Sequence, residues 1–384
     1  MAEVVSSNYL IMSLEKYEKG ILKTGFVLEN RIAQSLKMQG WSVISGKYYE
    51  DDFEDKIREI DLIAYKVDKV QDFDVYTCLI VSCKKSESCT WALLCRDLNL
   101  KDPNLDLRPL HSWSNQPSIQ YQLSSPTKAQ EYYADMIKLG VKDALADPKV
   151  EIFAFQEMNS ESGLPQNQKA IYDSIISLIK AQAYEMSALP ERKKAPCIYQ
   201  FNLLSVVDAN IVRLQFKGDK ISSELTTSEH HVSRYILKKK QSFSKIRFIN
   251  ASVFENILGD YDKLHEANLG WYSKVYDSFY VGIEKDQERI KLYINDFKRE
   301  IHWKIHSRVY KLLRKFIELE NVSLIWIEDK KSLMVLLNAK EDEDIKDIAN
   351  ELNGDSEAEQ YIAAALKKIY RYTGPFYFEG DIPF

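Results

Sequence analysis

The sequence lacks an apolar run long enough to span a lipid bilayer, and its first residues, MAEVVSSNYL, lack the pattern of a secretory signal peptide. Cysteine is also scarce: the five present are an odd number and form no CxxC pair. Reduced thiols are the simplest interpretation of these cysteines, with a zinc site as the alternative. We therefore expect a cytoplasmic protein that has no membrane partner.

An excess of positive charge is missing as well. The chain has 52 Lys and Arg residues against 57 Asp and Glu residues, which gives a formal net charge of −5 at pH 7. Nucleic-acid binding would therefore depend on local basic patches, because the overall field repels phosphates mildly. The composition is that of a globular protein, with 45% hydrophobic and 28% charged residues. The hydrophobic residues are numerous enough to build sizeable cores. The length of 384 residues favours two domains.

The stretch EIDLIAYKVDKVQDFDVYTCLIVSCKKSE, positions 59–87, predicts a β-hairpin around which the first domain is built. We expect strands at Asp61–Val67 and Val75–Lys84, because β-branched and aromatic residues dominate both and polar residues separate them. The apolar residues on both faces of these strands indicate a sheet that is covered on both sides.

Two charged side chains stand at the open end of this hairpin. Antiparallel pairing would place Asp61 opposite residues 81–83, and the two-residue period of a strand would project Ser82 and Lys84 from one face. A third unusual charge, Glu29, comes from a helix predicted over Ile21–Gln39. It interrupts the apolar stripe of that helix, where a carboxylate is costly unless it is paired, hydrated or bound to a cation. The predicted stripe consists of Leu22, Gly25, Phe26, Ile32, Ala33 and Leu36.

The order GFVLE, IDLIA, LIVSCKKS along residues 20–90 resembles the PD-(D/E)xK nuclease superfamily, in particular its branch of Mrr-like restriction enzymes and Holliday-junction resolvases. By position, Glu29 matches the helical acid of that family, Asp61 the hairpin acid and Lys84 the motif lysine. Ser82 stands where the family has Glu, Asp or Gln, and Glu59 is the nearest acid able to compensate. The resemblance implies an α/β fold with a restriction-endonuclease-like mixed central sheet flanked by helices.

The resemblance also implies a chemistry, the hydrolysis of phosphodiester bonds with Mg²⁺ or Mn²⁺. Asp61 and Glu29 would supply carboxylate ligands, and the backbone carbonyl of Cys83 is the usual third oxygen in the family. Lys84 would orient or deprotonate the attacking water. Ser82 offers only a neutral hydroxyl, which would weaken the affinity for the ion.

Two functions are consistent with these residues. The first is a metal-dependent endonuclease, with DNA as the expected substrate and restriction or phage defence as the expected setting. The second is a catalytically inactive nuclease-fold protein that serves as a nucleic-acid-binding or assembly subunit, and the serine at position 82 favours it. Taken alone, each charge also fits a simple ion pair, Asp61 with Lys84 or Glu29 with Arg58.

Basic residues near the predicted nuclease core are candidates for phosphate contacts that fix the register of the nucleic acid without reading its sequence. A solvated basic face is the alternative interpretation. The candidates are Lys85 and the cluster Lys238, Lys239, Lys240, Lys245 and Arg247.

The pattern of predicted strands and helices changes near residue 270, where we expect a domain boundary. Before it, Cys197–Val207 and Asn210–Phe216 predict a second hairpin that extends one mixed sheet. After it, residues 271–384 predict a separate α/β module with one or two long helices, broken or kinked near Lys298–His302, followed by two strands and two more helices. Partner binding, substrate binding, homo-oligomerisation and structural support all stay open for this module. Its basic face is predicted from Lys304, Arg308, Lys311, Arg314 and Lys315, with Trp303 and Tyr310 among them.

Overall fold

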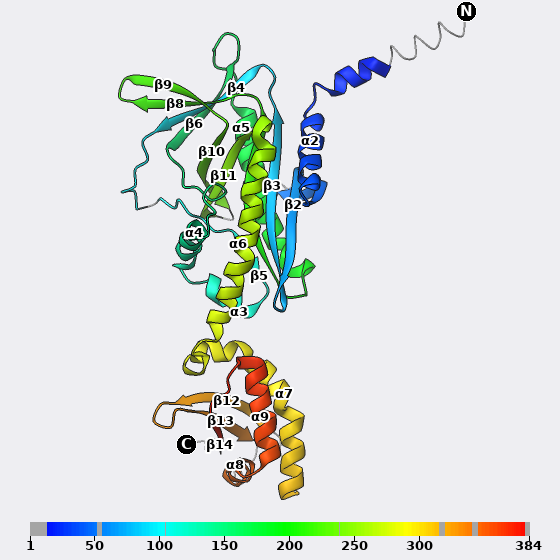
Figure 1. Ribbon diagram of the computed structural model, residues 1–384, viewed down its shortest axis with the longest axis vertical. Helices are drawn as coiled ribbons and strands as arrows, with labels where there is room; N and C mark the ends of the chain where they lie inside the picture. Colours follow the sequence, from blue (N-terminus) through cyan, green and yellow to red (C-terminus); the bar gives the residue numbers. More distant parts are fainter. Residues whose placement is uncertain are drawn as a thin grey trace, which may run out of the picture. The chain divides into compact units, whose positions relative to one another are not determined.

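The computed structural model describes residues 14–51, 56–103, 105–237, 239–314, 319–339 and 345–380. They form helices and mixed sheets (Figure 1), which confirms the predicted α/β class. The chain packs as two compact units. The first comprises the chain up to Gln116 and Leu123–Ser273, and the second comprises Pro117–Gln122 and the chain from Lys274 onward. The division therefore falls inside helix α6 (Phe254–Tyr280).

The main sheet of the first unit is mixed. Its first three strands run antiparallel to one another, the next two join by parallel pairing, and the last is again antiparallel. A short strand, β5 (Ser112–Ser114), pairs with one end of β7. The order across the sheet is β1 (Ser42–Asp51), β2 (Lys56–Val70), β3 (Phe73–Lys85), β7 (Cys197–Asp208), β11 (Lys240–Asn250) and β10 (Ser228–Leu237).

The predicted hairpin is β2 and β3, and both strands are longer than expected. Only two residues, Gln71 and Asp72, form the turn, and Gln71 has a positive φ of 53°, as tight hairpin turns require. Leu62 pairs with Val81. Asp61 therefore stands at the level of Ser82, within the predicted range.

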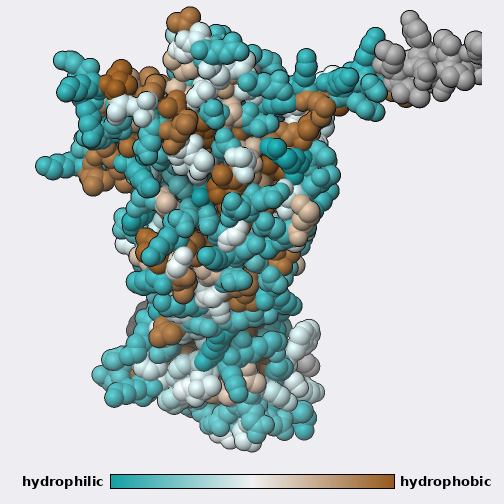
Figure 2. All heavy atoms as spheres, turned by 45° about the horizontal axis from the view of Figure 1, so that its top comes forward, coloured by the Kyte–Doolittle hydropathy of each residue, from teal (hydrophilic) through white to brown (hydrophobic). Residues whose placement is uncertain are grey.

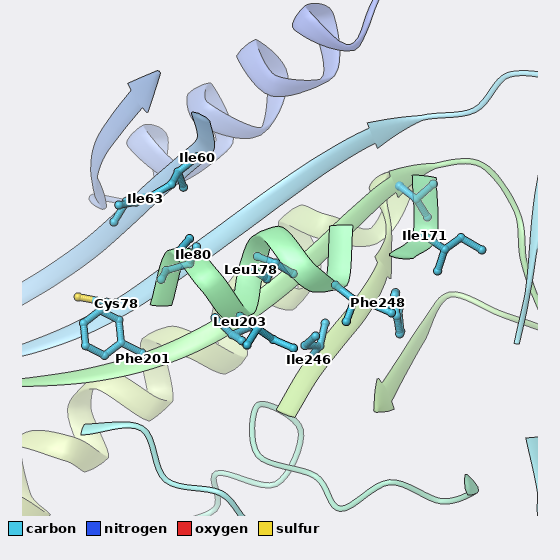
Figure 3. Packing of buried hydrophobic residues seen from close by; sticks show 14 of the residues in the cluster. Ile60, Ile63, Cys78, Ile80, Ile171, Leu178, Phe201, Leu203, Ile246 and Phe248 are labelled. Carbon is cyan, nitrogen blue, oxygen red and sulfur yellow. The ribbon is translucent and has the colours of Figure 1, made fainter. Parts of the chain in front are cut away.

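Helices cover both faces of this sheet. Helix α5 (Lys169–Arg192) packs its apolar side on one face, and Figure 3 shows Leu178 of this helix over the sheet residues Ile80 and Leu203. Helix α2 (Gly25–Met38) and helix α6 lie on the other face, joined by a 2.8 Å hydrogen bond from Ser35 Oγ to Glu255 Oε1. The sheet is thus buried on both sides, as its apolar strands indicate. Two shorter helices, α3 (Pro117–Leu123) and α4 (Lys128–Lys138), lie between β5 and β6 in the chain.

The predicted hairpin of Cys197–Val207 and Asn210–Phe216 is wrong. After β7 the chain leaves the main sheet and enters a second one, where β8 pairs in parallel with β4 and antiparallel with β9. The link is held by Asn250 Nδ2, which donates to the Ala209 carbonyl, and by the Trp91 N–H, which donates to the Asn210 carbonyl. Two adjacent apolar strands in a sequence do not reveal whether they share a sheet. The second sheet has the order β6 (Glu151–Asn159), β4 (Cys89–Arg96), β8 (Ile211–Lys217) and β9 (Lys220–Thr226).

Strand β9 is the outer strand of this second sheet and is largely solvent-exposed. Its apolar residues Ile221 and Leu225 are 58% and 71% exposed, and Phe153 of β6 is also exposed beside Phe216. Figure 2 shows hydrophobic atoms gathered at the upper left of its view, the side on which Figure 1 draws β6, β8 and β9. Part of the second sheet is therefore left uncovered by the first unit.

Two adjacent histidines of the first unit, His230 and His231, favour their neutral form. Burial, together with the nearby cations of Arg247 and Lys245, lowers the pKa of His230 to about 3. Burial also lowers the pKa of His231 to about 4, where the ring lies against Phe155 (5.2 Å between ring centroids). Protonating either ring would place a charge in the core, where burial disfavours it.

We expect these histidines to make the protein less stable in acid. Above pH 6.5 they are neutral in the folded and unfolded states alike; below it only the unfolded chain gains protons, so stability falls towards pH 4. Each histidine can contribute up to about 1.4 kcal/mol per pH unit. The test is urea unfolding at pH 7.5 and 5.5 for wild type and His231→Phe, which keeps an aromatic ring in place. The variant should lose less stability on acidification, and an identical loss would contradict this account.

The second unit combines a three-stranded sheet with helices α7, α8 and α9. Helix α7 (Gln287–Leu313) begins at Asp286, whose side chain accepts hydrogen bonds from the N–H groups of Glu288 and Arg289. The predicted break near Lys298–His302 is wrong: α7 is continuous there, and the chain turns earlier, at Gly282, which has a φ of 66°. The other elements are β12 (Leu319–Ile327), β13 (Ser332–Ala339), α8 (Ile345–Asn353), α9 (Ser356–Tyr370) and β14 (Phe376–Gly380).

Throughout the described part of the chain, no helix combines the length and the apolar character that crossing a membrane requires.

Candidate active site

The end of the β2–β3 hairpin brings two of the predicted site residues into contact. Lys84 Nζ lies 3.7 Å from Asp61 Oδ2. The same oxygen accepts a 2.7 Å hydrogen bond from the backbone N–H of Cys83, which fixes the carboxylate on the hairpin. Both charged side chains remain partly accessible, at 20% for Asp61 and 29% for Lys84. The pair is therefore oriented by the backbone and still reachable by a ligand.

Glu29 enters the same electrostatic environment from helix α2. Burial raises its pKa, and the carboxylates of Asp61 and Glu59 raise it further, while the Lys84 ammonium opposes them. Three carboxylates near one lysine form a region of negative potential that a cation would stabilise. Glu29 therefore lies within electrostatic range of Asp61 and Lys84, but it makes no ion pair with them and does not line the pocket described below.

The predicted stripe around Glu29 is partly wrong. Leu22 precedes the first residue of α2, and both Leu22 and Phe26 are solvent-exposed. Leu28 is buried instead, together with Ile32, Ala33 and Leu36. Glu29 therefore lies at the edge of the buried face of α2 and is only partly buried.

Ser82 occupies the position of the family's second acid, and it is buried with 3% exposure. Ser82 is two residues from Ile80, which packs against α5, so the two side chains project from the same face of β3. The Ser82 side chain therefore lies on the face that α5 covers. Its Oγ forms no hydrogen bond with any described residue. A longer acidic side chain here would have to enter packed space beneath α5, which gives a physical reason for a small residue.

A pocket of about 490 Å³ opens beside Asp61 and Lys84. Glu59, the acid expected to compensate for Ser82, lines it as well. One wall is α5. The lining residues are Tyr49, Ile57, Arg58, Glu59, Asp61, Lys84, Asp173, Ile176, Ser177, Lys180 and Tyr235.

Two residues that line this pocket belong to an ion-pair cluster that sequence reasoning missed. Asp51 Oδ2 lies 2.6 Å from Lys180 Nζ and 2.9 Å from Arg58 Nε. The Asp51 side chain has no solvent exposure, and that of Lys180 has 8%. The feature of the sequence that could have predicted this cluster is Lys180, a charged residue between apolar residues of an amphipathic helix. Arg58, which the sequence offered as a partner for Glu29, pairs with Asp51 instead.

The donor atoms suit a hydrated divalent cation held by few protein groups. Among the described residues, no three or more His, Cys, Asp or Glu side chains are grouped to hold a metal ion. Asp61 and Glu29 offer hard carboxylate oxygens, which Mg²⁺ accepts in small number because it keeps several waters. The thiol of Cys83 is buried, and burial with the nearby Asp61 raises its pKa, so it stays protonated. Any contribution of Cys83 to such an ion comes from its backbone, as the resemblance implies.

The Lys85 side chain makes contacts within the local structure. Its ammonium donates to the Leu22 carbonyl and lies 2.7 Å from Glu87 Oε1. These contacts tie the end of β3 to the segment that precedes α2. The predicted role of Lys85 in nucleic-acid binding therefore has no support from its position.

The predicted basic cluster does not form one surface. Lys239 and Lys240 are exposed at the turn between β10 and β11, and Lys238 lies outside the described residues. Lys245 and Arg247 are buried, which corrects their assignment. Lys245 Nζ donates to the carbonyls of Leu145 and Ala146, and Arg247 is paired with Asp260 at 2.9 Å. Burial lowers the pKa of Lys245 to about 8. The reason is that the second half of β11 is covered on both faces, so residues on either face of the strand are enclosed there.

The candidate site therefore consists of the Asp61–Lys84 pair, the Glu29 carboxylate of α2 and a pocket with α5 as one wall. Compared with known proteins, the chain matches no family model, no curated protein and no solved structure.

Proposed function

We propose that the first unit is a metal-dependent endonuclease that hydrolyses phosphodiester bonds, with DNA as the expected substrate. The observation that carries the proposal is the Asp61–Lys84 pair at the hairpin end, with the Glu29 carboxylate of α2 within electrostatic range of both. An ordinary ion pair would need only Asp61 and Lys84. The partly buried Glu29 adds a carboxylate that raises the electrostatic cost of the site, and a bound cation would offset that cost.

Each residue has a defined task in this proposal. Asp61 and Glu29 hold the ion through carboxylate oxygens, and the Cys83 N–H keeps Asp61 Oδ2 in a fixed orientation. When bound, a divalent cation neutralises phosphate oxygens and lowers the pKa of a water molecule. Lys84 orients the attacking water and offsets the negative charge that develops on the phosphate. Ser82 takes no part, because its side chain lies beneath α5.

A nucleic-acid-binding or assembly subunit without catalysis is the second candidate. The observation that favours it is the small number of ligands: Ser82 replaces an acid, and no group of three metal-ligating side chains occurs in the described residues. In that case Asp61 and Lys84 serve as a structural ion pair. This candidate predicts binding of nucleic acid with no cleavage.

Incubation of the purified chain with plasmid DNA, single-stranded DNA and RNA tests the proposal. We expect cleavage in Mg²⁺ or Mn²⁺ and none in excess EDTA, because the two carboxylates alone cannot activate water for this reaction. Ca²⁺, a larger ion with looser coordination geometry, is the control for ion-dependent binding. Cleavage that continues unchanged in EDTA would exclude this mechanism, and binding without cleavage under every condition would favour the second candidate.

A further inference from the structure

Helix α7 of the second unit carries a tryptophan that packing does not explain. Trp303 is 79% exposed, so most of its indole faces solvent. Its ring lies near those of His302 and His306, at 5.6 and 6.4 Å between centroids, and the two histidine rings lie 4.5 Å apart. A single exposed apolar residue is ordinary, but a group of rings around an exposed indole is a feature of binding surfaces.

The rings continue along one side of the helix. Trp303, His306 and Tyr310 follow at intervals of three or four residues, so they share one face of α7. Arg314 is the residue that ends the helix, with a left-handed φ of 57°. Tyr310 is 40% exposed. At 1.5 Å per residue, the row from Trp303 to Tyr310 is about 10 Å long. We call these four residues, with His302 and Lys311, the α7 stripe.

The charge of this part of α7 has one sign. Residues 301–314 contain no Asp or Glu, although the whole chain is acidic. Two of the predicted basic residues are neutralised within the unit: Lys304 lies 2.9 Å from Glu300, and Arg308 pairs with Asp355. Lys311 and Arg314 form no ion pair with the described residues, and Lys315 lies outside them. Together with Arg308, Lys311 helps to lower the pKa of the Asp355 carboxylate, so the described residues compensate the charge of Lys311 only in part.

We propose that the α7 stripe binds single-stranded nucleic acid, with a base stacked on Trp303 and phosphates beside Lys311 and Arg314. Exposed rings next to available cations provide the two interactions that single strands use, stacking and phosphate contact. Bases within a duplex do not offer their faces to a side chain, so a single strand fits better. The inference deepens the proposed function and rests on it, since it assigns the second unit a contact with the same class of substrate.

The test measures binding by the full chain, with fluorescein-labelled single-stranded DNA and RNA in EDTA to prevent cleavage. Trp303→Ala should weaken binding about 5- to 100-fold, the usual range for a lost base–aromatic stack, and Trp303→Phe should restore much of it. Replacing both Lys311 and Arg314 with alanine should reduce the slope of log affinity against log salt by about 1.4. Lys291→Ala is the matched control on the same helix, because Lys291 pairs with Glu288 away from the stripe.

These results separate the inference from the proposed function. Trp303 is so exposed that its removal should leave thermal unfolding unchanged. Equal affinity of wild type and Trp303→Ala, or no binding of either strand, would overturn the inference, even if the chain cleaves DNA. Loss of binding in Trp303→Ala, in a protein that never cleaves, would keep the inference and reject the nuclease.

Discussion

Replacing Asp61 with asparagine is expected to abolish metal-dependent cleavage while the protein stays folded. Asparagine keeps an oxygen that can accept the Cys83 N–H but removes the charge that attracts a cation. Lys84→Ala should reduce the rate about 10²- to 10⁴-fold, the usual range for a positioned group that handles a proton. Supercoiled plasmid cleavage, followed over time at saturating Mg²⁺, measures both effects.

Ser82→Ala is the matched control for these variants. It lies on the same strand as Lys84, two residues away, and its Oγ makes no hydrogen bond within the described residues. Its removal should therefore change cleavage by less than about 3-fold, since a lone buried hydroxyl contributes little. If cleavage survives in Asp61→Asn, the active-site assignment is wrong.

Asp51→Ala is expected to lower the free energy of unfolding by about 3–5 kcal/mol, because breaking a buried ion pair from one side leaves a desolvated charge behind. The loss of this carboxylate leaves the Lys180 ammonium buried in α5 without its 2.6 Å partner. The cost is far larger than the net contribution of the intact pair. Chemical denaturation monitored by circular dichroism measures the change.

Glu288→Ala provides the comparison for Asp51. Its partner Lys291 lies 2.8 Å away, but both side chains are largely exposed. A surface pair of this kind contributes at most about 1 kcal/mol. A loss in Asp51→Ala no larger than that of Glu288→Ala would show that the Asp51–Lys180 pair does not stabilise the wall of the pocket.

Local patterns sufficed to predict the hairpin and the class of the fold. Two runs of β-branched and aromatic residues on either side of a polar turn define β2 and β3 almost without tertiary information, because a short hairpin pairs with itself. The partners of β7 could not be predicted in this way. Pairing between β7 and β3, and the passage of β8 into a second sheet, depend on contacts between segments that are distant in sequence.

The site was predictable only where charges interrupt apolar patterns. Asp61, Lys84 and Glu29 each stand out from a strand or helix that is otherwise apolar. Lys245 and Arg247 look like a surface patch in the sequence, because the burial of both faces of β11 depends on how distant segments pack around it. The α5 wall of the pocket was missed for a similar reason: Asp173 and Ser177 look like ordinary surface residues of an amphipathic helix.

The parallel pairing of β3 with β7 has a consequence for how the chain folds. Ile80 has to meet Leu203, and more than 100 residues of chain separate the two strands. The hairpin of β2 and β3 can form as soon as it is synthesised, but the free edge of β3 must wait until β7 has left the ribosome. Closing so long a loop is slow compared with forming a hairpin, and an unpaired apolar edge invites association with other chains. During synthesis, the strand that carries Lys84 is therefore the part of the molecule most in need of protection.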